Sequence, residues 1–352
     1  MSNKRLYVDF HVIQTVPPSC VNRDDTGRPK TAFYGGVNRS RVSSQSWKHA
    51  VRVMFKEIFD DEKLGFRTKY VAKLIADKLV AAGFDEEKAM KKATEALTNA
   101  GLKKIGDKKD NTTGALFFIS ALQVEKLAEL VLNDEKDKKK YKEALNSLPS
   151  VDMSLFGRMV ADDVNLNVDA SCQVAHSIST HAVESEYDYF TALDDCSKLD
   201  NAGAGHLGTM EFNSSTLYRY ATVNVMDLFK TIGTDVADAV EGFARAFIFS
   251  MPTGKQNSYA NRTLPDLIYV TVREDQPVNF SGAFEEPVKG KEGFVSESKT
   301  KLFDYAKEIY DNYCSQPKYS FVIGNDEILG AEKKNINEFL TQLHEIITNE
   351  VN

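Results

Sequence analysis

The stretch from Ser19 to Lys56 reads SCVNRDDTGRPKTAFYGGVNRSRVSSQSWKHAVRVMFK and concentrates positive charge on an acidic chain. It holds eight lysines and arginines against two aspartates, a net charge of +6, whereas the whole protein has a formal net charge of −7. A basic segment of this kind indicates a polyanionic partner, because phosphate groups bind where lysine and arginine gather.

The second half of the stretch predicts an amphipathic helix at about residues 44–59. Polar side chains recur at intervals of four, three and four residues on one face: Arg41, Gln45, Lys48 and Arg52. Apolar side chains take the opposite face: Trp47, Val51, Met54, Phe55 and Ile58. Ser43 or Ser44 can cap this helix, which leaves first-turn amides for a phosphate. The same pattern also fits a solvated basic face on an ordinary core helix.

Three motifs in and around this stretch give it a family likeness: PPSCVNRDD at 17–25, FYGG at 33–36 and RVSSQSWK at 41–48. They closely resemble the N-terminal signature of the CasC family, which supplies the repeating backbone subunit of the type I-E CRISPR surveillance complex, Cascade. Later blocks resemble the family in the same order: AHSI at 175–178, YFTA at 189–192, HLGT at 206–209, YRYA at 218–221 and GKQ at 254–256. Residues 60–150 and the C-terminal tail carry no clear family pattern.

The resemblance implies a non-enzymatic, multi-copy subunit without a cofactor. It is expected to bind CRISPR RNA (crRNA), to join further copies of itself in a helical filament, to contact other Cascade subunits and to display the guide to target DNA. Binding is expected to ignore guide sequence, because base pairing supplies the recognition. The expected RNA phosphate or sugar contacts, with their polar positioners, are Arg23, Lys30, Ser43, Gln45, Lys48 and Arg52.

The elements predicted along the chain have the order β-α-β-β-α-β. Strands are expected at 6–12, 170–182, 213–225 and 265–273, and helices at about 44–59 and 235–250. The strand at 6–12 alternates apolar and polar residues, which predicts one buried face. This α+β order is the ferredoxin-like arrangement also used by RNA-recognition domains.

Two insertions divide the predicted core. In the family, the core is likened to a palm, a helical insertion to fingers and a second insertion to a thumb. The expected division is palm 1–59, finger 60–168, palm strand 169–182, thumb 183–212, and the rest of the palm with C-terminal helices at 213–352.

Two residue groups in the insertions have a predicted role and a plainer alternative. By resemblance, Met159, Phe190 and Thr191 surround a guide base displaced from the stack, although the first two also fit ordinary core positions. The finger is expected to offer target DNA a track of lysines, although a mixed-charge run is commonly a solvated face. These lysines are Lys136, Lys138, Lys139, Lys140 and Lys142.

Other function classes find less support in the sequence. Asp24-Asp25 is the paired carboxylate of the basic segment, and a metal-dependent endoribonuclease built on it is one alternative. His176 and His181 are five residues apart on a predicted strand, so they point to opposite faces and form no metal site. The sequence shows no membrane-spanning run, signal peptide or paired-cysteine motif, so a cytoplasmic protein is expected. A stand-alone single-stranded RNA-binding module is the remaining alternative.

Overall fold

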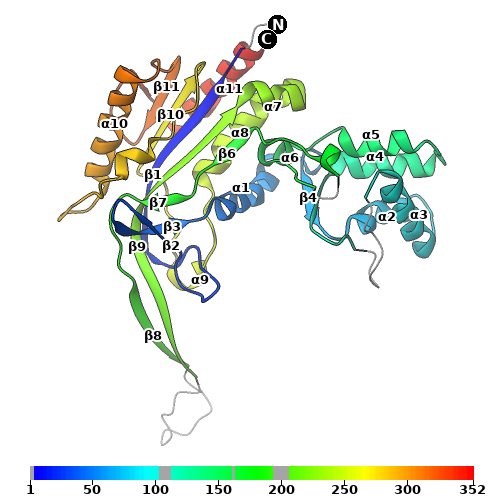
Figure 1. The fold of residues 1–352 in the computed structure, drawn as a ribbon, viewed down its shortest axis with the longest axis horizontal. Coiled ribbons are helices and arrows are strands. Elements are labelled where there is room, and N and C mark those ends of the chain that lie inside the picture. Colours follow the sequence, from blue (N-terminus) through cyan, green and yellow to red (C-terminus); the bar gives the residue numbers. More distant parts are fainter. Residues whose placement is uncertain (1–3, 103–111, 161–162, 193–205) are drawn as a thin grey trace, which may run out of the picture. The chain divides into compact units, whose positions relative to one another are not determined.

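The computed structural model describes residues 4–102, 112–160, 163–192 and 206–352, and shows a mixed α+β protein with one large sheet (Figure 1). The chain divides into two compact units. The first contains Met1–Val51, Val174–Thr222 and Ala244–Leu340, and the second contains Arg52–Gln173, Val223–Phe243 and Thr341–Asn352. The boundaries of these two units differ from those of the expected palm, finger and thumb, and that division remains a prediction. No described helix is long and apolar enough to cross a membrane.

The first unit is built on the large sheet, in the strand order β12-β11-β10-β1-β9-β7-β3-β2. The strands up to residue 182 are β1 (Tyr7–Ser19), β2 (Thr31–Tyr34), β3 (Val37–Val42), β6 (Cys172–Val174) and β7 (Ser177–Ser179). The strands after residue 182 are β8 (Glu186–Ala192), β9 (His206–Asn224), β10 (Leu267–Arg273), β11 (Tyr319–Ile323) and β12 (Glu332–Lys333). The strands β10, β1, β9 and β7 therefore lie side by side at its centre.

Two of the predicted strands differ in extent from those observed. The strand expected at 170–182 is two short strands, β6 and β7, and Ala175 between them still donates its N–H to the Tyr220 carbonyl at 3.0 Å. The strand expected at 213–225 is the second half of β9, whose first half pairs antiparallel with β8. One long strand thus belongs both to the central sheet and to a hairpin that projects from it (Figure 1).

Strand β1 is buried on both faces, whereas its alternating sequence predicts one exposed face. Asp9 and His11 are fully buried beneath aromatic side chains and helix α10 (Val295–Asn312). Tyr220 Oη donates to Asp9 Oδ1 at 3.1 Å, and burial raises the pKa of Asp9 to about 6. His11 Nδ1 lies 2.9 Å from Tyr218 Oη, and burial lowers its pKa to about 3. The covering layer comes from sequence more than 200 residues away, which alternation within β1 cannot reveal.

The second unit contains the helical insertion. Its elements are β4 (Gly65–Thr68), α2 (Val71–Ala81), α3 (Glu86–Asn99), β5 (Phe117–Ser120), α4 (Ala121–Leu132), α5 (Lys138–Asn146), α6 (Val151–Phe156) and α7 (Val225–Ile232). Apolar side chains of α2 to α5 form one core, in which α3 contributes mainly alanines. Helix α4 begins at a capping box, because Ser120 Oγ accepts from the Gln123 amide and Gln123 Oε1 accepts from the Ser120 amide.

Four further α-helices lie in the described parts of the chain. They are α1 (Ser44–Ile58), α8 (Val236–Phe249), α9 (Gln256–Tyr259) and α11 (Ile336–Val351). Helices α1 and α8 lie within two residues of their predicted ends, since each has a continuous apolar stripe at helical spacing. The buried stripe of α1 consists of Trp47, Val51 and Phe55.

Candidate nucleic-acid interface

The start of α1 is held by hydrogen bonds to two other parts of the first unit. Ser43 donates its N–H to Asn22 Oδ1 at 2.9 Å, and Ser44 donates its N–H to His176 Nδ1 at 3.1 Å. Because the helix begins at Ser44, Arg41 does not belong to its polar face and lies on β3. Gln45 is exposed and Lys48 is half-buried on the same helix.

The buried side of α1 rests on an arginine that sequence reasoning missed. The Trp47 indole Nε1 donates to Ser177 Oγ at 2.9 Å, and the Arg219 guanidinium carbon lies 3.8 Å from the Trp47 ring centre. Arg219 also donates to Gln14 Oε1 at 2.5 Å and to the Phe247 carbonyl. No carboxylate of the described residues pairs with Arg219, and burial lowers its pKa to about 9. The YRYA motif contains this residue, but gives no sign that it is buried.

The basic segment contains cations of two kinds. Arg39 is buried and donates to the carbonyls of Ser179 and Phe284, while Arg28 pairs with Glu211 at 2.8 Å. These two therefore stabilise the fold of the first unit. In the described parts of the chain no ion pair involves the remaining candidates of the loop and β3: Arg23, Lys30 and Arg41. These three are the cations available to an anionic ligand.

Arg52 has a structural partner within its own unit, the second. Its Nε lies 2.9 Å from Asp152 Oδ2, its Nη2 donates to the Gly65 carbonyl at 3.2 Å, and it stacks over the Phe118 ring. Asp152 is buried and also accepts from the Gly65 amide at 3.0 Å. Arg52 therefore ties α1 to β4, β5 and α6, and it is less available to RNA than the sequence suggests.

The loop between β1 and β2 uses its paired carboxylate to hold its own shape. Asp24 Oδ1 accepts from the Thr26 amide at 2.9 Å, from the Thr26 hydroxyl at 2.8 Å and from the Arg28 amide at 3.0 Å. The hydroxyl hydrogen bond is the main reason why the pKa of Asp24 lies below its usual value. Asp24 therefore behaves as a turn-forming aspartate.

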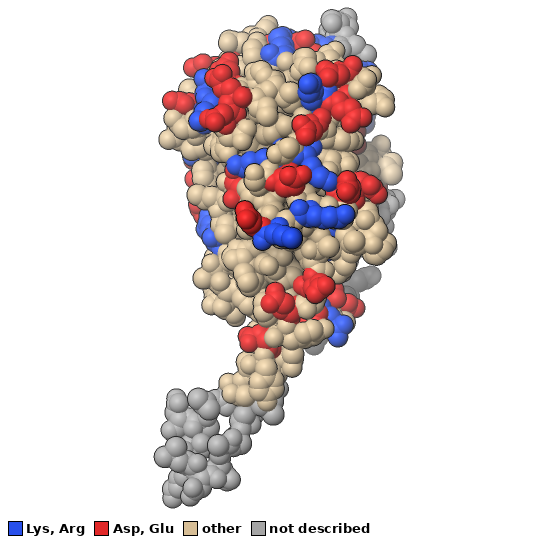
Figure 2. Space-filling view, turned by 90° about the vertical axis from the view of Figure 1, so that its left-hand side faces the viewer, with Lys and Arg blue, Asp and Glu red and all other residues tan. Residues whose placement is uncertain are grey.

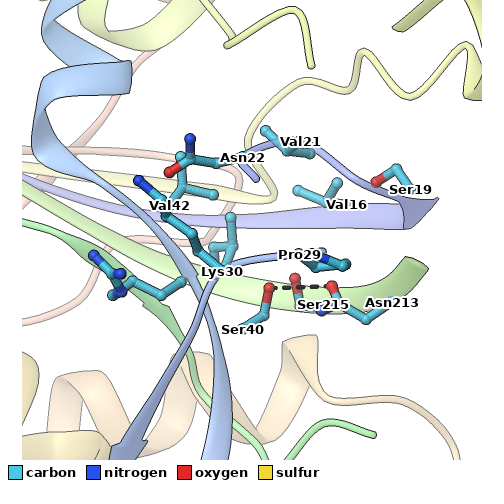
Figure 3. A pocket seen from close by; sticks show the side chains of 12 residues that line it. Val16, Ser19, Val21, Asn22, Pro29, Lys30, Ser40, Val42, Asn213 and Ser215 are labelled. Carbon is cyan, nitrogen blue, oxygen red and sulfur yellow. Dashed lines mark hydrogen bonds between the residues drawn. The ribbon is translucent and has the colours of Figure 1, made fainter. Parts of the chain in front are cut away.

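A small pocket opens beside this loop, between β1, β3 and β9 (Figure 3). It is lined by Val16, Ser19, Val21, Asn22, Pro29, Lys30, Ser40, Arg41, Val42, Asn213, Ser215 and Leu217. None of these residues is acidic, so the polar lining consists of hydroxyls, amides and two cations. Ser40 Oγ donates to Asn213 Oδ1 at 3.1 Å inside the pocket.

The hairpin of β8 and β9 carries aromatic side chains on both faces. Phe190 pairs with Gly208, and a Cβ at Gly208 would lie 2.3 Å from the Phe190 ring, so the glycine lets the ring cross the strand. Phe190 is 40% exposed, Tyr187 and Tyr189 are more exposed, and Thr191 is exposed as well. In Figure 2 the described end of the hairpin shows mainly uncharged side chains, which suits stacking contacts better than phosphate contacts.

Met159 projects from an anchored segment of the second unit. Arg158 before it is buried and donates to the carbonyls of Leu166 at 2.7 Å and Leu145 at 3.1 Å, and burial lowers its pKa to about 10. Met159 itself is 86% exposed. A flexible apolar side chain on a rigid base is suited to contact an unstacked nucleotide.

The lysines around α5 fall into two groups. Lys136 pairs with Asp134 and Lys140 pairs with Glu135, and the Lys140 contact is the main reason why the pKa of Glu135 falls to about 2. Lys138, Lys139 and Lys142 are exposed and make no ion pair with any residue the structure describes. The second group is therefore the one available to a nucleic-acid backbone.

His176 and His181, which the sequence analysis excludes as a metal site, both take part in hydrogen bonds. His181 Nδ1 lies 2.8 Å from the Ala182 carbonyl, its Nε2 accepts from the Thr216 amide at 3.1 Å, and its ring stacks on Phe294. His176 accepts from Ser44, as described above. Within the described ranges no cluster of three or more His, Cys, Asp or Glu residues is placed to hold a metal ion.

Comparisons with known proteins agree with this architecture. The model of the CT1975-like protein family matches residues 8–348. A solved chain described as "CRISPR RNA-guided surveillance complex, pre-nicking" is 32% identical, with a TM-score of 0.81, 96% of this chain covered and 100% of that one. Another, described as "CRISPR RNA-guided surveillance complex", is 29% identical, with a TM-score of 0.63 and coverages of 96% and 99%. Among curated proteins, none matches significantly.

The fold, the basic segment and these matches define a subunit of the CRISPR RNA-guided surveillance class. The chain belongs to the CT1975-like family, whose members are CasC-type backbone subunits of such complexes. The family resemblance read from the sequence motifs is thereby confirmed.

Arg52→Ala is expected to lower the free energy of unfolding by about 2–3 kcal/mol, because it leaves the buried Asp152 carboxylate without its cation. Lys56→Ala, at the exposed end of the same helix, is the control and should change stability by less than about 0.5 kcal/mol. Urea denaturation measures both. Equal stability of the two variants would contradict the structural role of Arg52.

Proposed function

We propose that this protein binds the spacer region of crRNA without regard to sequence, polymerises along it as a multi-copy filament and displays it for pairing with target DNA. The observation that supports this most strongly is the family match over residues 8–348, together with the cations of the loop and β3 that form no ion pair with a described carboxylate. A guide must be replaceable, so protein contacts to backbone and shape suit the task better than contacts to base edges.

In this proposal the first unit supplies a ferredoxin-like palm. Its central order β10-β1-β9-β7 corresponds to the fourth, first, third and second strands of a β-α-β-β-α-β chain. Lys30, Lys48 and Arg23 contact phosphates, and Ser43 and Gln45 position the strand at the start of α1. The 183–212 region is the thumb, whose Phe190 and Thr191 contact a displaced base. The 60–168 region is the finger, whose Met159 also contacts a displaced base.

The proposed role is that of a binding protein and not of a nuclease. Metal-dependent RNA cleavage at Asp24-Asp25 needs carboxylate oxygens directed at a cation. Asp24 Oδ1 instead accepts three hydrogen bonds from its own loop. The arrangement thus favours a loop-shaping role over the endoribonuclease alternative.

Replacing Lys30 and Lys48 together with glutamine is expected to weaken RNA binding and to flatten its salt dependence. Each lost phosphate contact should reduce the log–log salt slope by about 0.7, so the double variant should lose about 1.4. Fluorescence anisotropy with a mixed-sequence RNA across a salt series measures this. Lys307→Gln, an exposed lysine on α10, is the control. An unchanged slope in the folded double variant would refute the phosphate contacts.

Lys138, Lys139 and Lys142 are proposed to contact target DNA. Their joint replacement by glutamine should leave assembly on guide RNA intact and weaken DNA binding by the assembled complex, most strongly at low salt where screening is least. Replacing Lys136 and Lys140, which already pair with carboxylates, is the matched control and should have a smaller effect. If the complex with the triple variant binds target DNA as tightly as the wild-type complex across the salt series, the lysines of α5 are a solvated face and not a DNA contact.

A further inference from the structure

The pocket beside the β1–β2 loop contains a buried amide with an unsatisfied donor. Asn213 is 6% exposed, and its Oδ1 accepts from Ser40. Its Nδ2 is shielded from solvent and has no hydrogen-bond partner among the residues the structure describes. Burying an amide without a partner is costly, and native proteins keep few such groups. A bound molecule that supplies the missing partner explains why this one is retained.

The pocket restricts the chemistry of that molecule. The side chains of Ser40, Asn213 and Ser215 point into it from β3 and β9, and Lys30 lies on its opposite side (Figure 3). Its enclosed space suits about one water-sized group, so a single oxygen fits and a base does not. The absence of acidic residues from its lining favours a neutral or anionic oxygen over a cation.

We propose that this pocket receives a ribose 2′-hydroxyl of the bound guide and makes the protein prefer RNA to DNA as its guide strand. The inference rests on the proposed guide-binding function. A hydroxyl both donates and accepts, so it satisfies the Asn213 amide and the Ser215 hydroxyl together. Lys30 and Arg41 beside it are placed for the neighbouring phosphate. The 2′-hydroxyl is also the group by which proteins distinguish RNA from DNA.

The test compares RNA and DNA strands of the same sequence, bound to wild type and to Asn213→Leu. Wild type should bind RNA more tightly. Asn213→Leu, which keeps similar side-chain size, should weaken RNA binding about fivefold, the worth of one hydrogen bond, and leave DNA binding unchanged. Asn261→Leu is the control, because Asn261 is also buried and its amide also lacks a hydrogen-bond partner among the described residues, but it does not line the pocket. The ratio of RNA affinity to DNA affinity of this variant should equal that of wild type.

Each other outcome overturns a distinct claim. The 2′-hydroxyl contact would be overturned if Asn213→Leu lost RNA and DNA affinity equally, so that the ratio of the two affinities stayed unchanged. It would also be overturned if wild type bound both strands equally. A wild type that binds neither strand would overturn the proposed function itself. If Asn213→Leu does not show a cooperative melting transition, Ser40→Ala takes its place, because it removes the group that orients the amide. The same fall in ratio is then expected, and an unchanged ratio would refute the contact.

Discussion

The stacking of Arg219 on Trp47 is the contact on which the proposed interface depends. Trp47 is the first buried residue of α1 after the capping turn, and its indole is fixed on one side by Ser177 of β7 and on the other by Arg219 of β9. The helix start therefore has one position relative to these two strands. Because Ser43 and Ser44 also bond to Asn22 and His176, the loop, the helix and the sheet are joined at one point.

Whether a lysine or arginine is available to RNA depends on the burial of its charged group and on its ion-pair and hydrogen-bond partners. The guanidinium groups of Arg39, Arg158 and Arg219 are buried and donate mainly to backbone carbonyls, so they organise the fold. Arg52 is committed to a buried carboxylate. Fewer cations are left for a polyanion than the sequence count suggests, and three of them, Arg23, Lys30 and Arg41, lie on the β1–β2 loop and β3. Local concentration, and not total charge, then accounts for RNA binding by an acidic protein.

The sequence predicted the parts of the structure that local patterns encode. The apolar stripe of α1 and its serine cap gave the helix ends, and alternation located the central strands. Prediction from the sequence failed where residues distant along the chain determine whether a side chain is buried. Asp9 and His11 look exposed by alternation, but are covered by α10 and its preceding loop. Arg41 matches the helical spacing by coincidence, because β3 ends only after it. A single sequence gives no sign of the roles of Asn213 and Arg219, since only the fold shows that they are buried and lack some partners among the described residues.

The most direct test of the backbone-subunit account is the number of protein copies bound to RNAs of increasing length. Native mass spectrometry of the purified protein with unstructured RNAs gives this number for each length. The account predicts that copies increase in regular steps as the RNA lengthens, with the same step for unrelated sequences. One copy per RNA at every length, or copies that depend on sequence and not on length, would contradict it and favour a stand-alone RNA-binding module.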